Sequence, residues 1–168
     1  GSDLSNYNVT VDSIATYSLK TTNSFALANL NTSVVDGGGP LNSGVWAIGP
    51  NAVNITLDAG DTLQQVINKF NAVSDTSKIK ASAIQTSAGN YALQLKSTET
   101  GSVMNYALPG GMLNIALNVD QLADDAKITI DGTQITRSNN TISDAINGIT
   151  FELKQQTPMG TTLNLDVA

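Results

Sequence analysis

Apolar residues occupy every second position along much of this chain. Near its start, Tyr7, Val9 and Val11 alternate with polar residues, which is the pattern of a strand with one buried face. Residues 14–30 mix apolar residues with many hydroxyls and are also predicted to be mostly extended. The alternation returns at residues 53–57, 79–84, 91–95, 115–119, 149–153 and 163–167. These patterns predict a fold built mainly from strands.

One segment breaks the alternation. Its apolar residues recur at helical spacing on one stripe, as Leu63, Val66, Ile67, Phe70 and Val73. Thr62 and Gln65 stand three residues apart, as in the capping box that opens many helices. The spacing therefore predicts one amphipathic helix over residues 62–73. A hairpin with its loop at residues 87–90 is expected to follow, and the helix to cover a small antiparallel sheet.

Asp131-Gly132 carries the best hairpin signal in the chain. Both residues tolerate the positive φ that a two-residue hairpin turn requires. A turn at this point pairs Ile128 with Ile135 and leaves Ile130 on the same face of the sheet. The shared apolar face supports this register.

The stretch after that hairpin is predicted to form a short helical turn. Thr141 and Asp144 fit a second capping box, and Gly148 is suited to end the turn. Ile142 and Ile146 lie four residues apart, so they would share one side of the turn. We expect this turn to connect two hairpins and to close one end of the sheet.

The second of these hairpins is expected to join residues 149–153 to residues 163–167, through a turn at Pro158 and Gly160. Taken together, the elements predict a mainly β fold with one clear helix, of the α+β class, in two small antiparallel-sheet domains. Each domain would have roughly 80 residues, a size at which one core supplies little stability.

Composition narrows the possible functions. Charged residues make up 13% of the chain, about half the usual share. Ser, Thr and Asn together contribute 52 of 168 residues, and they suit turns and exposed strand faces. The formal net charge of −6 argues against binding to nucleic acid or to an anionic membrane. The apolar runs are too short for a membrane-spanning helix.

The chain has no Cys and no His. This excludes Ser–His–Asp and Cys–His nucleophiles, zinc bound by Cys or His, and disulfides. The opening Gly1-Ser2 is typical of a cloning scar, so we expect the chain to be a piece of a longer protein.

Several residues could in principle form a site, and for each the structural interpretation is preferred. Asp36-Gly37-Gly38-Gly39-Pro40 lacks the Lys-Ser/Thr of a phosphate-binding loop and is predicted to be a linker. Asp124-Asp125 offers too few oxygens for calcium and is predicted to be a solvated turn. Trp46 could stack on a sugar or a partner, but it is expected in the core or between the lobes.

The two glutamates and the Asn-x-Ser/Thr triplets do not change this conclusion. Glu99 and Glu152 are the only glutamates, and Glu152 is expected on an outward strand face rather than in a glycosidase pair. The triplets are expected by chance in a chain so rich in Asn and Thr, and they begin at Asn8, Asn31, Asn54 and Asn139. We therefore predict no catalytic residue, no cofactor and no metal, and we assign no interface residues.

Three blocks of the sequence resemble bacterial flagellar axial proteins. Residues 61–72 followed by 79–101 resemble the hook-IN type segment of these proteins. Residues 126–154 are similar to a hairpin, Ser-Asn-Thr and turn segment of the hook-associated protein 2 family, which caps flagellar filaments. Residues 6–26 resemble the strand before a Ser/Thr/Ala-rich stretch in that family. Residues 36–52 and 104–120 match no part of it.

The resemblance implies a nested organisation, in which the strands around Val9 and Leu165 lie in one sheet. Residues 1–40 and 121–168 would form an outer discontinuous β domain, and residues 41–120 an inserted α+β domain of strand, helix and hairpin. It also implies a structural, non-enzymatic assembly protein at the filament tip, outside the cell, exported by the flagellar type III route. The implied partners are further copies in a cap ring, flagellin, hook–filament junction proteins and host mucin or glycan. The isolated chain is expected to be mainly monomeric.

Three other functions stay open at this point. One is the equivalent region of another axial protein, such as a hook–filament junction protein or a flagellin variable domain. A second is a carbohydrate-binding adhesin module, for which Trp46 and Tyr91 would be the residues to test. The third is a hydrolase.

Overall fold

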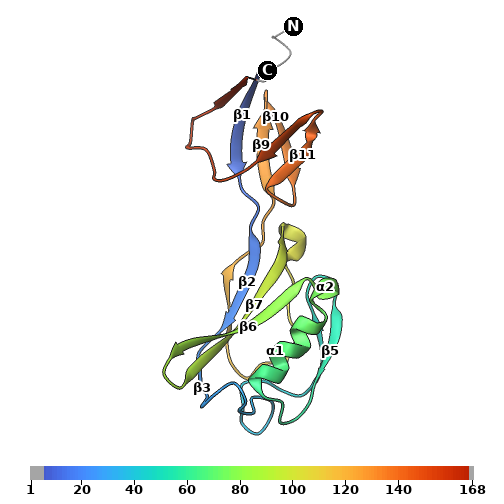
Figure 1. Cartoon of the computed structure of the whole chain (residues 1–168), viewed down its shortest axis with the longest axis vertical. Helices are drawn as coiled ribbons and strands as arrows, with labels where there is room; N and C mark the ends of the chain where they lie inside the picture. Colours follow the sequence, from blue (N-terminus) through green and yellow to red (C-terminus); the bar gives the residue numbers. More distant parts are fainter. Residues whose placement is uncertain (1–5, 167–168) are drawn as a thin grey trace. The chain divides into compact units, whose positions relative to one another are not determined.

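The computed structural model describes residues 6–166 of the chain, and within it they form two compact units. Unit 1 consists of the residues up to 16, residues 100–103 and the residues from 123 onward. Unit 2 consists of residues 17–99 and 104–122. Among the described residues, no helix has the length and apolar character needed to cross a membrane. Strands dominate both units, as the alternating pattern predicts (Figure 1).

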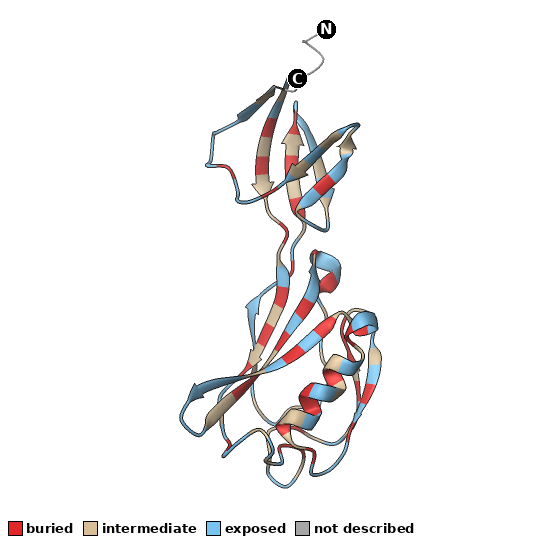
Figure 2. Cartoon of the chain, viewed as in Figure 1, coloured by how far each residue is buried: buried red, intermediate tan, exposed pale blue. Residues whose placement is uncertain are grey.

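Among its described residues, unit 1 contains strands and the start of a short 3-10 turn at Ser102. Its strands are β1 (Asn6–Ser13), β9 (Ala126–Ile130), β10 (Thr133–Arg137), β11 (Thr141–Ile146), β12 (Ile149–Glu152) and β13 (Leu163–Asp166). Four of them form one sheet in the order β10-β9-β1-β13, and β11 and β12 form a separate hairpin. Buried residues alternate with partly exposed residues along β9 and the second half of β1 (Figure 2).

The two ends of the described chain pair with each other in this sheet. β1 is antiparallel to β13, with Tyr7 opposite Leu165 and Val9 opposite Leu163. The prediction that the strands around Val9 and Leu165 share a sheet is therefore confirmed. Val167, the last residue of the predicted strand, lies outside the described residues.

The hairpin predicted at Asp131-Gly132 is confirmed in its register. β9 and β10 pair with Ile128 opposite Ile135 and Thr133 opposite Ile130. Both turn residues have positive φ, 47° at Asp131 and 87° at Gly132, as a tight hairpin with this handedness requires.

The helical turn predicted around Thr141 is wrong. Residues 141–146 form strand β11, which pairs with β12 through a turn at Gly148, where φ is +81°. Asp144 does not cap a helix; its carboxylate accepts a hydrogen bond from Arg137 Nε at 2.9 Å. Thr141 and the isoleucines are β-branched residues that favour strands, and pairing with β12 prevailed over a capping motif with no helix to cap.

The hairpin predicted between residues 149–153 and 163–167 is also wrong. β12 pairs with β11, whereas β13 pairs with β1. Hairpin β11–β12 lies against the apolar face of the four-stranded sheet, and Ile142 is only 1% exposed there. The core of unit 1 consists of Val9, Val11, Ala15, Ala126, Ile128, Ile130, Ile142 and Leu153.

Unit 2 contains a main sheet, a small hairpin and the helix. Its elements are β2 (Tyr17–Thr22), β3 (Phe25–Ala26), β4 (Gly44–Ile48), β5 (Val53–Leu57), α1 (Leu63–Ala72), α2 (Ser74–Ser77), β6 (Ile79–Ser87), β7 (Asn90–Thr100, whose last residue belongs to unit 1) and β8 (Leu117–Gln121). In the main sheet, β7 pairs with β2, β3 and β6, and β8 pairs with β2. β4 and β5 form the separate hairpin.

Helix α1 confirms the strongest helical signal in the sequence. Thr62 is the N-cap, and its capping box with Gln65 is complete in both directions. Leu63, Val66 and Phe70 are buried on the predicted stripe, and α1 lies between β6 and β5 (Figure 1). The ring of Phe70 packs edge-on against Trp46 at a centroid distance of 6.0 Å, which fixes the centre of this core.

The expected boundary of the outer domain at residue 40 differs from the unit boundary, which lies between Thr16 and Tyr17. The physical reason is that β2 pairs with β8 and β7, both of which reach into the helix-bearing unit. Residues 31–40 also belong to unit 2, because Val34 and Val35 are buried in its core. The sequence gives no local signal of this, since residues 6–26 read as a continuous extended stretch.

Uncharged polar side chains complete backbone pairing in both units. In unit 1, the amide of Asn140 accepts from Ala15 N–H at 2.6 Å and donates to Ala15 C=O at 3.0 Å. In unit 2, Asn71 bonds in the same two ways to Ala81, at 2.8 and 3.1 Å. Thr22 Oγ1 accepts from Leu93 N–H at 2.9 Å. Part of the high Ser, Thr and Asn content therefore satisfies backbone groups that no strand reaches.

An ion-pair cluster secures the loop before α1. Asp61 is buried, and its Oδ2 accepts from Asp58 N–H at 2.8 Å and from Lys69 Nζ at 2.6 Å. Lys69 also reaches Asp58 at 2.9 Å. Burial opposes ionisation of Asp61, but the hydrogen bonds from Lys69 and Asp58 outweigh it and hold the pKa of Asp61 below its ordinary value.

We expect Ile142→Ala to lower the free energy of unfolding of unit 1 by about 2–4 kcal/mol, because it empties a buried site in the core. Urea unfolding followed through the amide resonances of β1 and β9 measures this change. The control is Thr141→Ala, an exposed position on the same strand, with an expected cost under about 1 kcal/mol. Equal and small effects of the two substitutions would show that hairpin β11–β12 does not cover the core.

We expect Asp61→Asn to destabilise unit 2 by about 1–3 kcal/mol at neutral pH, because it removes a charged acceptor from two hydrogen bonds. The folded-state pKa of Asp61 is lowered, so its contribution is fully present above the ordinary pKa of 3.8 and is lost as pH falls through the folded pKa. The difference between wild type and variant should therefore shrink in acid. Thermal unfolding from neutral to acid pH tests this, with Asp58→Asn, at an exposed carboxylate, as control. A difference that stays constant with pH would contradict it.

Candidate interaction surfaces

The acidic pair Asp124-Asp125, which sequence analysis considered for calcium, accepts hydrogen bonds from within the chain. Asp125 accepts hydrogen bonds from Ser102 N–H at 2.8 Å and from Ser102 Oγ at 2.9 Å. Asp124 Oδ1 accepts from Asp125 N–H at 2.8 Å. Within residues 6–166, no group of three or more His, Cys, Asp or Glu side chains could hold a metal ion.

Trp46 does not form a binding surface. It is 0% exposed, and its indole N–H donates to Asn42 C=O at 3.1 Å. The expectation that Trp46 belongs to a core is therefore confirmed, and a sugar ring cannot stack on it. Tyr91 is half-buried and packs against the same core.

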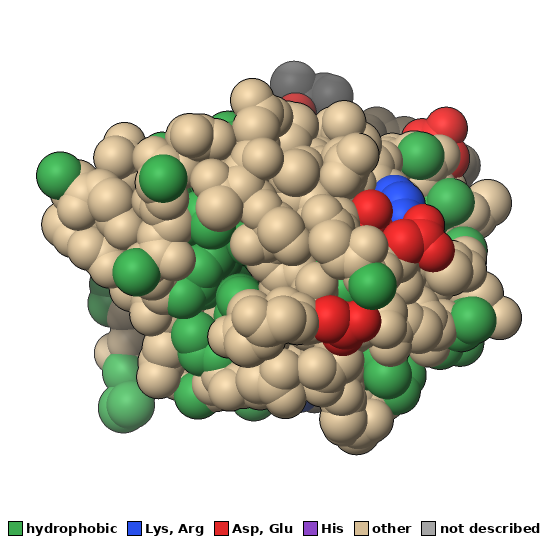
Figure 3. All heavy atoms as spheres, turned by 90° about the horizontal axis from the view of Figure 1, so that it is seen from below, with side chains coloured by type: hydrophobic (Ala, Val, Ile, Leu, Met, Phe, Trp, Pro, Cys, Tyr) green, Lys and Arg blue, Asp and Glu red, His purple; other side chains and the backbone are tan. Residues whose placement is uncertain are grey.

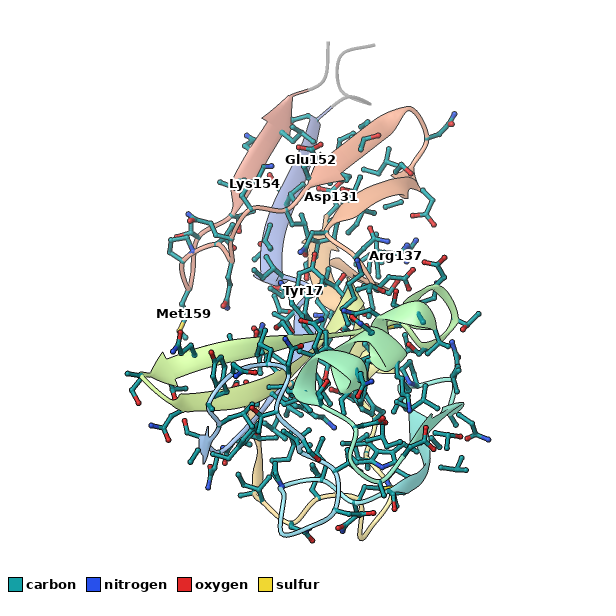
Figure 4. The ribbon with its side chains drawn as sticks, turned by 60° about the horizontal axis from the view of Figure 1, so that its bottom comes forward. Tyr17, Asp131, Arg137, Glu152, Lys154 and Met159 are labelled. Atoms are coloured by element: carbon teal, nitrogen blue, oxygen red, sulfur yellow. The ribbon has the colours of Figure 1, made fainter. Side chains whose placement is uncertain are left out.

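The two glutamates lie in different units and have separate partners. Glu99 is 3.6 Å from Lys78 Nζ in unit 2. Glu152 is exposed on unit 1, as expected, 3.4 Å from Lys154 Nζ. Figure 4 shows both groups of this ion pair near β12, and it shows Met159 at the tip of the following loop. Met159 is fully exposed.

The two segments that sequence analysis did not place in the family, residues 36–52 and 104–120, lie side by side in unit 2. Asn42 Nδ2 donates to Gly111 C=O at 2.6 Å, and Asn114 Nδ2 donates to Asn42 Oδ1 at 2.8 Å. Asn114 N–H also donates to Pro40 C=O at 2.9 Å. Asp36 accepts from Ser43 N–H at 2.9 Å, and hydrogen bonding to Ser43 lowers the pKa of Asp36.

These two segments form one wall of a pocket of about 410 Å³ at the end of unit 2. Figure 3 views this end of the unit and shows apolar side chains on the floor of a hollow. The residues around the pocket are Phe25, Ala26, Leu27, Ser33, Gly38, Gly39, Pro40, Asn114 and Ile115. None of them is charged, so the pocket suits a neutral group rather than an ion. Sequence analysis missed it, because its walls come from segments far apart in the chain.

A second apolar hollow lies on unit 1 beside the edge strand β13. Its volume is about 360 Å³, and Val9, Val11, Phe151, Leu163 and Leu165 supply most of its lining. Leu163 is half exposed there. The hollow marks the end of the sheet that hairpin β11–β12 leaves uncovered.

Lys20 is a buried cation without a carboxylate partner in the described residues. Its ammonium group donates to Tyr106 C=O and lies 4.0 Å from the centroid of the Tyr106 ring. Burial lowers the pKa of Lys20 and raises the pKa of Tyr106. These contacts hold the loop around Tyr106 against β2.

The comparisons with known proteins follow the division into units. Residues 29–99, within unit 2, match the family model of the flagellin hook IN motif. Residues 123–168, within unit 1, match the family model of the flagellar hook-associated protein 2 C-terminus. No curated protein sequence matches the chain.

The chain is also similar to several solved structures. It shares 24% identity with the D2-D3 domains of the flagellar cap protein FliD from Serratia marcescens, covering 97% of this chain and 93% of that one, with a TM-score of 0.75. FliD (HAP2) from Pseudomonas aeruginosa PAO1 gives 24% identity, 97% and 79% coverage and a TM-score of 0.74. The D1-D2-D3 domains of FliD from Escherichia coli share 22% identity with the chain. The similarity covers 95% of this chain and 48% of that one, with a TM-score of 0.73.

The similar structures identify the fold of the chain. The fold is that of the D2-D3 domains of flagellar cap proteins, and it extends over nearly the whole chain. Residues 123–168, which match the flagellar hook-associated protein 2 C-terminus, lie within this fold. The resemblance of the chain to flagellar hook-associated protein 2 is confirmed by these matches.

Proposed function

We propose that this chain is part of the cap at the tip of a flagellar filament and acts there as a structural protein. The observation that supports this most directly is the order of the two family matches, each in its own unit of one cap-protein fold. The match to the hook-associated protein 2 C-terminus favours the cap over a hook–filament junction protein or a flagellin variable domain. The similarity to structural cap proteins likewise favours a structural over a catalytic role.

The proposal includes the cap's place and partners. The protein would be exported by the flagellar type III route, assemble with further copies of itself, contact flagellin and the hook–filament junction proteins, and assist flagellin polymerisation outside the cell. Contact with host mucin or glycan is also part of the proposal, and it would need residues other than the buried Trp46.

The chemistry of the two units fits such a role. Their surfaces carry few charges and many neutral hydroxyl and amide groups, so passing flagellin subunits would meet no strong ionic attraction. The absence of Cys from the chain means that no disulfide hinders unfolding during export.

We expect antibodies raised against this chain to label only filament tips on cells that produce the full-length protein. Immunogold electron microscopy of intact flagella tests this. Cells lacking the gene provide the control, and they are expected to release flagellin into the medium with few filaments. Label at the junction of hook and filament, or along the filament, would contradict the cap and support one of the other axial proteins.

We expect the isolated chain to be mainly monomeric at micromolar concentration. The large exposed apolar side chains are spread over both units and include Val45, Ile84, Val119 and Leu163, and a stable interface requires a contiguous buried area of about 1,000 Å² or more. Light scattering after size-exclusion chromatography measures the mass. A stable ring at this concentration would show that these two units alone hold the assembly together.

A further inference from the structure

Two lysines and a tyrosine form a row across the outer face of the main sheet of unit 2. Tyr17 lies on β2, Lys96 on β7 and Lys80 on β6. Lys80 stands directly opposite Lys96 in the antiparallel register. The ammonium group of Lys96 lies 4.6 Å from the centroid of the Tyr17 ring. Figure 4 labels Tyr17 at the start of β2.

Neither lysine has an ion-pair partner in the part of the chain that the structure describes. Among residues 6–166, no carboxylate oxygen lies within ion-pair distance of Lys80 or Lys96, whereas the other lysine near them, Lys78, is paired with Glu99 at 3.6 Å. On neighbouring β8, Asp120 accepts a hydrogen bond from Thr21. Like charges directly opposite each other destabilise a sheet. An uncompensated pair is unexpected in a chain whose net charge is −6.

The pair lines a shallow, open hollow on this face of the sheet. The hollow has a volume of about 330 Å³, and its lining residues are Tyr17, Lys80, Lys96, Ser97 and Thr98. Ser97 is buried, and its hydroxyl accepts from Ser18 N–H at 2.9 Å and donates to Glu99 C=O at 2.6 Å. The backbone beneath the two lysines is therefore held in place. Thr98 is exposed on the same face of β7 as Lys96.

We propose that this hollow, the lysine pocket, binds a small oxyanion such as sulfate, phosphate or a carboxylate. Each ammonium group offers three donors to an oxyanion, and an anion between the two lysines replaces their repulsion with two charge-assisted hydrogen bonds. Tyr17 holds Lys96 over its ring by a cation–π contact, which restricts the side chain before an anion arrives. The site is independent of the cap role.

The anion could be free in solution or belong to a polypeptide. A free anion implies that inorganic sulfate or phosphate suffices. If the anion belongs to a polypeptide, glutamate side chains of a peptide should bind more tightly than free sulfate or phosphate. Both sources use the same chemistry at Lys80 and Lys96, so both must lose binding in the same variants.

The test uses the whole chain, with the amide resonances of Ser97 and Thr98 as the readout. Sodium sulfate and a short glutamate-rich peptide are titrated separately, against sodium chloride at matched ionic strength. We expect saturable shifts with either probe and none with chloride. Lys96→Gln and Lys80→Gln should each weaken binding about tenfold or more, because each removes a charge-assisted hydrogen bond.

Lys154→Gln is the matched control. It removes the same charge from unit 1, where Lys154 pairs with Glu152, and it should leave binding unchanged. Tighter binding of the peptide assigns the site to a polypeptide, and tighter binding of sulfate assigns it to a free anion. Equal responses to chloride, or equal losses in all three variants, would show only general screening and would overturn the proposal. Unchanged spectra elsewhere in unit 2 confirm that each variant folds.

Discussion

The pairing of β1 on both of its edges is the constraint on which unit 1 depends. On one side β1 pairs with β13, and on the other it pairs with β9, where Val9 faces Ile130 and Val11 faces Ile128. Both partners come from the far end of the chain, so the sheet forms only after a long loop has closed. Unit 2 is the content of that loop. The core of unit 1 therefore cannot assemble from either end alone.

The two units cover the apolar face of their sheets with different elements. Unit 2 covers its sheet with α1 and builds a centre around Trp46 and Phe70. Unit 1 has no α-helix among its described residues and covers its sheet with hairpin β11–β12 instead. The chain has no cysteine for a disulfide, and the side chains of Asn140 and Asn71 hold the backbone of Ala15 and Ala81 by hydrogen bonds. This fits a structural role that needs defined surfaces and no reactive groups.

Local signals in the sequence were sufficient where a single segment decides its own structure. The stripe and capping box of α1 act within a few residues, and so does the turn at Asp131-Gly132. Composition alone excluded His and Cys chemistry. The family resemblance held for the same reason, since it was carried by these locally defined blocks.

Only the tertiary structure decided which strands pair. Thr141 and Asp144 read as a helix start, yet β11 is a strand because β12 offers it a partner and the sheet offers Ile142 a buried place. The pocket beside Asn114 and the row from Tyr17 to Lys80 are formed by residues far apart in the sequence. Alternation of apolar residues identifies a strand and its buried face, but it carries no information on the partner across the hydrogen bonds, and every surface of this protein depends on that partner.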